Sequence, residues 1–78
     1  MNLSECPLRQ LAEVTEVSGD AHLRHRLMDL GIYAGVLVEV VGAMPFSGPL
    51  IIRAQGATLA LRRGEAACIQ VQARKTLS

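Results

Sequence analysis

The sequence predicts a mainly β fold, a small barrel of about five antiparallel strands with one short inserted α-helix. The chain has 78 residues and half of them are apolar, which fits one domain over residues 1–78 with a single core. Short runs rich in β-branched residues recur between turn signals, and only one segment shows helical periodicity. So few short strands hide their edges best by curling into a barrel.

The helix is predicted over residues 20–30. Asp20 suits the N-cap, since its carboxylate can accept a backbone N–H and its charge favours the positive end of the helix dipole. Leu23, Leu27 and Leu30 recur at i, i+4 and i+7, so we expect this leucine face to enter the core. Gly31 can take the left-handed conformation that ends a helix.

The strands are expected on either side of this helix, and the run Val36–Val41 is mostly apolar on both faces, as in a central strand. Gly42 indicates a bulge or a bend, and Arg63–Ala66 is expected to be a connector of about one helical turn. Ala73–Ser78 is expected to be a frayed tail outside a core of residues 3–72. An SH3-like barrel matches this size. The strands are expected at Ala12–Val17, Val36–Val41, Leu50–Ala54, Thr58–Arg62 and Cys68–Gln72. The core is expected to hold Leu27, Leu30, Val38, Val40, Ile52, Leu59, Leu61, Ile69 and Val71.

Composition argues against several classes of protein. Eight basic and seven acidic residues give a net charge of +1, and Tyr33 and Phe46 are the two aromatic residues, so a nucleic-acid-binding domain is not expected. No run approaches a membrane span and no signal peptide is visible, which predicts a cytoplasmic protein that is not membrane-inserted. Cys6 and Cys68 are expected as reduced thiols, although the sequence leaves a single disulfide between them open.

Motifs for catalysis are absent, since the sequence holds no phosphate-binding glycine loop, nucleophile elbow or HExxH, and we expect no enzyme. His22, His25 and Asp29 could share a helix face, a donor set that suits zinc or ferrous iron, with a cysteine as an additional ligand. We favour a solvated face with at most a weak or adventitious ion, and therefore expect no cofactor.

Two further features could meet a partner. The loop Met44–Pro49 carries Phe46 among prolines and glycine, and this aromatic ring either packs back on the core or awaits a partner. Five arginines form a solvated barrel rim or a patch for an acidic surface; they are Arg24, Arg26, Arg53, Arg62 and Arg63.

Two ordered motifs resemble the bacterial ferrous iron transport protein A family, FeoA, and the likeness runs from about Leu3 to Val71. The first, LRxRLxDLGxxxG, is met from Leu23 to Gly35, and the second, LxLRxxEAxxIxV, from Leu59 to Val71. The chain departs from the family at Ala34, where Pro is usual, in the loop PFSGP, where PLGDP is usual, and at Gln55 and Ala57.

The resemblance implies a cytoplasmic SH3-like barrel without chemistry of its own, which assists the membrane ferrous iron transporter FeoB by binding its cytosolic GTPase part. It also implies recruitment by FeoB to the inner face of the membrane, and weak self-association stays open. The residues that we expect near the partner-binding surface are Leu23, Arg24, Asp29, Met44, Phe46 and Arg62.

One alternative comes from another class. The same barrel type occurs as the C-terminal module of iron-dependent repressors, so a metal-responsive domain using His22, His25 and Asp29 stays open. A free-standing repressor is not expected, because no helix-turn-helix precedes the barrel.

Overall fold

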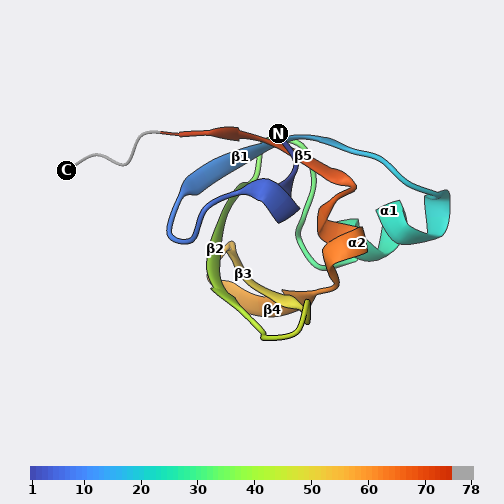
Figure 1. Cartoon of the computed structure of the whole chain (residues 1–78). Helices are drawn as coiled ribbons and strands as arrows, with labels where there is room; N and C mark the ends of the chain where they lie inside the picture. Colours follow the sequence, from blue (N-terminus) through green and yellow to red (C-terminus); the bar gives the residue numbers. More distant parts are fainter. Residues whose placement is uncertain (75–78) are drawn as a thin grey trace.

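The computed structural model describes residues 1–74, and its five strands form one antiparallel sheet in the order β4-β3-β2-β1-β5. The sheet curls round a single core (Figure 1), so the predicted mainly β fold is confirmed. The strands are β1 (Leu11–Val17), β2 (Leu37–Ala43), β3 (Leu50–Ala54), β4 (Ala57–Leu61) and β5 (Ile69–Ala73). The helices are η1 (Leu3–Glu5, a 3₁₀ turn), α1 (Ala21–Asp29) and α2 (Arg63–Ala66).

The core is built from alternate residues of all five strands, together with residues that the chain brings in from outside the sheet. Leu3 of η1 and Ile32, which follows α1, are both buried, and neither was expected in the core. Leu59 is half-buried and packs against the core from the edge strand. The expected core residues that are buried are Leu27, Val38, Val40, Ile52, Leu61, Ile69 and Val71.

Helix α1 begins as predicted, because the Asp20 carboxylate accepts the Leu23 N–H at 2.8 Å. Its end corrects the predicted leucine face. Gly31, at φ +88°, turns the chain so that the Ile32 N–H donates to the Leu27 carbonyl at 2.8 Å. Ile32 thereby fills the core position beside Leu27, and Leu30 is 41 % exposed, so its prediction as a core residue is wrong.

Strand β2 is central, as predicted, and Gly42 lies where its register with β3 shifts, which confirms the bulge. The C-terminal end is better ordered than the predicted tail. Ala73 belongs to β5, and the Arg74 N–H donates to the Leu11 carbonyl at 2.9 Å. The rest of that predicted tail, residues 75–78, lies outside the described residues.

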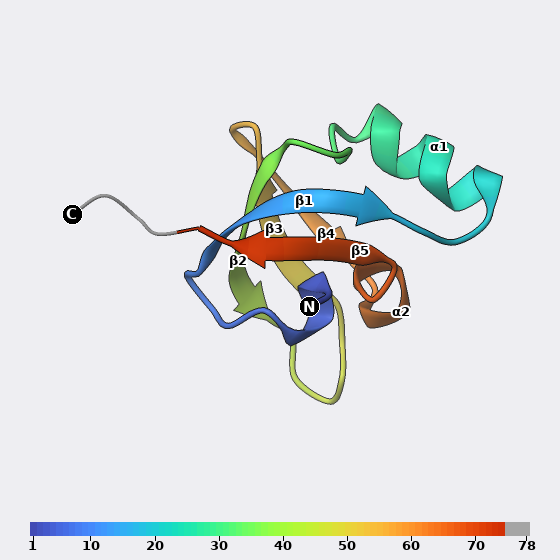
Figure 2. The same ribbon diagram turned by 90° about the horizontal axis from the view of Figure 1, so that it is seen from above.

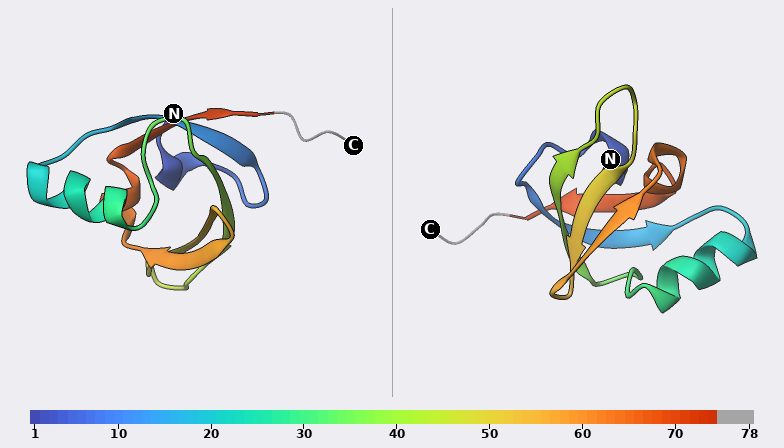
Figure 3. Two further views of the ribbon diagram at one scale, coloured as in Figure 1. Left: turned by 180° about the vertical axis from the view of Figure 1, so that it is seen from behind. Right: turned by 90° about the horizontal axis from the view of Figure 1, so that it is seen from below.

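The elements outside the sheet gather at two ends of the barrel. Figures 2 and 3 show η1, α2 and the loop between β2 and β3 at one end, with α1 beyond the opposite end. We call these the loop end and the helix end. None of the helices described within residues 1–74 is long and apolar enough to cross a membrane.

Candidate functional site

The loop between β2 and β3 is a tight, doubly hydrogen-bonded turn. The Met44 N–H donates to the Pro49 carbonyl at 2.9 Å, and inside this bond the Gly48 N–H donates to the Pro45 carbonyl at 3.1 Å. Phe46 and Ser47 have φ values of +59° and +58°. Two consecutive left-handed residues inside a four-residue turn define a type I′ turn, which follows the right-handed twist of a β-hairpin.

This backbone is unfavourable for the residues that occupy it. Type I′ turns favour Asn-Gly, and the left-handed conformation costs an ordinary L-residue about 1–2 kcal/mol. Phe46 and Ser47 both adopt it, and such strain persists where the surrounding structure fixes the chain. Gly48 allows the turn to close this tightly, because it has no Cβ atom. A Cβ there would lie 2.9 Å from the Met44 Cβ and 3.1 Å from the Pro45 oxygen.

The turn presents its aromatic ring to solvent. Phe46 is 100 % exposed and Met44 is 49 % exposed, so of the two outcomes expected for this ring the structure shows the one in which it stays off the core. The sequence between Glu39 and Arg53 contains no charged residue. The loop is therefore a stiff, uncharged projection with an apolar tip, the property of an anchor that enters a partner's pocket.

At the helix end, α1 is fixed by contacts at its start. The Arg24 Nη1 donates to the Gly19 carbonyl at 2.7 Å, and Leu23 packs against the core. Met28, Leu30 and Asp29 are exposed, so the outer surface of α1 mixes apolar and acidic side chains.

An ion pair ties α1 to α2. Arg26 pairs with Glu65, although Asp29 lies only three residues further along the same helix. The Glu65 carboxylate also accepts the Arg62 N–H at 2.9 Å, which caps α2. The hydrogen bond from Arg26 holds the pKa of the Glu65 carboxyl below its ordinary value; partial burial opposes this, and the Arg62 N–H adds to it.

The six residues expected on one partner-binding surface lie on different parts of the barrel. Leu23, Arg24 and Asp29 belong to α1 at the helix end, whereas Met44 and Phe46 belong to the loop end (Figure 2). Arg62 is exposed where β4 passes into α2. The six residues therefore do not form one continuous surface at a single end of the barrel.

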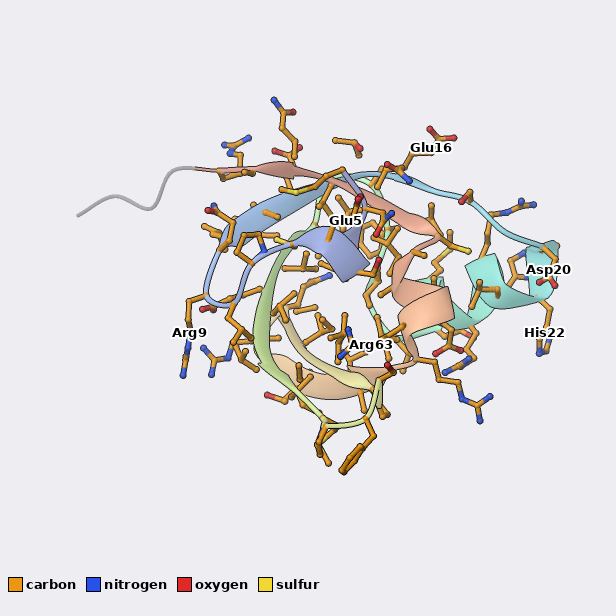
Figure 4. The ribbon with its side chains drawn as sticks, viewed as in Figure 1. Glu5, Arg9, Glu16, Asp20, His22 and Arg63 are labelled. Carbon is orange, nitrogen blue, oxygen red and sulfur yellow. The ribbon has the colours of Figure 1, made fainter. Side chains whose placement is uncertain are left out.

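The metal-ligand candidates do not converge. His22 extends away from the barrel near the start of α1, as Figure 4 shows, and His25 and Asp29 are also exposed. Among residues 1–74 no three His, Cys, Asp or Glu side chains lie close enough to hold one metal ion. Cys6 and Cys68 are both free, and burial raises the pKa of the Cys6 thiol.

One feature of the helix end was not predicted. A shallow hollow, lined by residues 33–37 and Gln55, lies where the β3–β4 turn meets the segment after α1. The Gln55 Nε2 donates to the Gly31 carbonyl at 3.0 Å and to the Tyr33 Oη at 3.4 Å. The residues that form this contact are more than 20 positions apart, so local sequence patterns do not indicate it.

Comparison with known proteins agrees with this architecture. The FeoA domain family matches residues 1–73. The chain belongs to the FeoA family. A curated relative from Porphyromonas gingivalis, the Fe(2+) transport protein A/Fe(2+) transporter FeoB fusion protein, is 32 % identical over 72 residues, which cover 92 % of the chain. The chain spans only 8 % of the length of that relative.

Solved FeoA structures share the fold. The solution structure of FeoA from Chlorobium tepidum is 38 % identical, with a TM-score of 0.88 over 94 % of this chain and 70 % of that one. The zinc-complexed FeoA from Stenotrophomonas maltophilia, described as an SH3 domain protein, is 33 % identical, with a TM-score of 0.80 over 92 % of this chain and 89 % of that one. The barrel of this FeoA-family chain is thus SH3-like, and the family is an accessory family linked to ferrous iron transport.

Proposed function

We propose that this FeoA-family protein is a non-catalytic cytoplasmic accessory protein of ferrous iron uptake, which binds the FeoB transporter through its cytosolic part and regulates it. The observation that carries this proposal is the fully exposed Phe46 on its stiff turn. The P. gingivalis relative, whose name joins FeoA and FeoB in one chain, supports the identity of the partner. Recruitment to the inner face of the membrane follows from such binding.

The physical reason for an anchoring role lies in the cost of association. Association has a cost for ordering the loops and side chains of the interface, and a turn whose backbone is already fixed avoids the part of this cost that belongs to the loop. Aromatic residues that enter a pocket supply a large share of interface energies. Phe46 has both properties, since its ring is uncovered while its backbone is held by the bonds of Met44 and Gly48.

A contact at the helix end supplies a route to regulation. Arg24 is exposed there, although one of its guanidinium nitrogens already donates to the Gly19 carbonyl. The remaining donors are available to an acidic surface of the transporter. A protein that contacts a GTPase part at two ends can favour one nucleotide state over another, because only a difference in affinity between states shifts their balance.

The proposal is tested by calorimetric titration of the full chain into the cytosolic part of FeoB from the same organism, without nucleotide, with GDP and with a GTP analogue. We expect binding in at least one state, weakened by about tenfold or more in Phe46→Ala and in Arg24→Glu. The matched control is Leu8→Ala, which removes an apolar side chain that is 58 % exposed in a different loop. The absence of a complex in every nucleotide state contradicts the proposal.

The metal-responsive alternative has less support in the geometry, because the described ligand candidates on α1 do not gather. It is tested by titrating ferrous iron or zinc into the parent chain and into His22→Ala. Binding at micromolar concentration or tighter that the substitution removes would favour this alternative.

A further inference from the structure

The loop end carries a cationic group whose hydrogen bonding is incomplete. Arg63 is the first residue of α2, and Figure 4 shows its side chain directed into the open end of the barrel, between η1 and strands β3 and β4. The side chain is half-buried, and its Nε is buried without a hydrogen-bond partner within residues 1–74. Arg63 also takes part in none of the ion pairs among these residues.

An unpaired guanidinium donor of this kind is uncommon. Buried side-chain donors in folded proteins have a partner in the large majority of cases, and arginine cannot discard its charge by deprotonation. Two acidic residues, Glu65 on the same short helix and Glu5 on η1 at the same end of the barrel, are already engaged. Glu65 binds Arg26 and the Arg62 N–H, and Glu5 on η1 accepts the Asn2 N–H at 3.1 Å. Residues 1–74 therefore hold Arg63 ready for an acceptor that they do not themselves supply.

The same end carries the anchor. The loop with Phe46, together with η1 and α2, lies at one end of the barrel in Figure 2 and in the right view of Figure 3. We infer that the loop end docks an acidic segment of the protein partner, with a carboxylate on the Arg63 guanidinium and an apolar pocket around Phe46. This inference rests on the proposed function and deepens it, since it specifies the chemistry of the partner's surface.

A carboxylate fits the guanidinium for a geometric reason. Its two oxygens match two parallel N–H donors of arginine, and a side-on pair uses Nε–H together with one Nη–H. An anionic membrane surface fits this end less well. Lipid recognition relies on clusters of about four to eight Lys or Arg residues, whereas here Glu5 of η1 stands at the same end as Arg63 (Figure 4).

The test uses the full chain and the cytosolic part of FeoB, with three variants. Arg63→Met keeps the aliphatic stem and removes the guanidinium, and we expect Kd to rise about 10- to 100-fold, as for loss of a charged hydrogen bond. Arg63→Lys keeps the charge without the fork and recovers part of this loss. The control Arg9→Met removes the same charge from an exposed turn that Figure 4 shows at another side, and changes Kd by less than about threefold.

A second measurement separates docking from a structural role. Because Arg63 Nε has no partner within the described chain, Arg63→Met should leave the thermal unfolding midpoint unchanged or raise it. The inference is overturned if Arg63→Met binds as tightly as the parent, or if its midpoint falls and the binding loss matches the unfolded fraction. It is also overturned if anionic phosphatidylglycerol vesicles, and not the protein, show the dependence on Arg63.

The outcomes distinguish the two proposals. Weakened binding in Phe46→Ala together with unchanged binding in Arg63→Met leaves the proposed function standing and removes this inference. A parent chain that fails to bind the cytosolic part of FeoB in any nucleotide state overturns the proposed function, and this inference with it.

Discussion

Two leucines that the helical pattern treats alike should differ sharply in their contribution to stability. Leu27 is fully buried and its carbonyl accepts the Ile32 N–H, whereas Leu30, one turn further along, is 41 % exposed. Truncating a fully buried leucine costs about 2–5 kcal/mol, since it removes transfer free energy and leaves a cavity. Truncation at Leu30 should cost less than about 1 kcal/mol, because much of its surface already contacts water.

The scale of this difference is large for so small a domain. A chain of 78 residues is expected to have about 4–12 kcal/mol of folding free energy, so a loss of about 2–5 kcal/mol in Leu27→Ala removes about a sixth of it or more. Urea unfolding followed by circular dichroism measures the effect. With an m value of about 1 kcal/mol/M, the midpoint should fall by 2 M or more in Leu27→Ala and by less than about 1 M in Leu30→Ala.

The comparison also checks the end of α1. If the two variants lose the same stability, then the left-handed turn at Gly31 does not carry Leu30 out of the core, and the placement of Ile32 beside Leu27 is wrong. Leu30→Ala that unfolds at a lower urea concentration than Leu27→Ala would contradict the reasoning more strongly. An unchanged m value in both variants is needed for the midpoints to report stability alone.

Three further predictions concern the ion pair, the turn and the thiols. The pKa of Glu65 is lowered in the folded state, so the stability that its carboxylate contributes is present above the ordinary value of 4.5 and is lost as pH falls through the folded pKa. Glu65→Gln should therefore destabilise the protein by about 0.5–1 kcal/mol at pH 7 and have little effect near pH 2, as urea unfolding at the two pH values can show. Replacing Phe46-Ser47 by Asn-Gly should raise the free energy of unfolding by about 1 kcal/mol or more and should weaken partner binding. A double variant that is less stable than the parent and binds the partner as tightly contradicts both the strain at this turn and the role of the Phe46 ring. Iodoacetamide should modify half-exposed Cys68 before buried Cys6, as mass spectrometry of the native protein can show; equal rates would mean that the core is open around Cys6.

Much of the fold follows from local chemistry. Alternation at Thr58–Leu61 predicts a half-buried strand because side chains of a strand point to opposite faces, and the structure leaves Thr58 and Ala60 exposed with Leu61 buried. Asp20 predicts the start of α1 because the cap is a contact between residues three apart. These features depend on residues that are close together in the chain, so local sequence patterns predict them.

The site is only partly of this kind. An aromatic residue between prolines identifies the loop of Phe46 as a candidate contact, but its exposure depends on whether the turn bends toward the core, which the left-handed backbone of Phe46 and Ser47 decides. The separation of Arg24 from Phe46 depends on which end of the barrel each element reaches. Sequence spacing carries no such information, since the barrel brings distant segments together and parts neighbouring ones.

Composition, periodicity and two ordered motifs thus determine the barrel, its short inserted helix α1 and the family, because burial of apolar side chains and helix capping act over a few residues. Only the tertiary structure shows that Leu30 is exposed while Ile32 is buried, and that Arg26 pairs with Glu65 on α2. The tertiary structure alone also shows that the Nε of Arg63 is buried without a partner in the described chain. Hydrogen bonds and ion pairs across a fold depend on positions in space, and the closure of the sheet sets those positions.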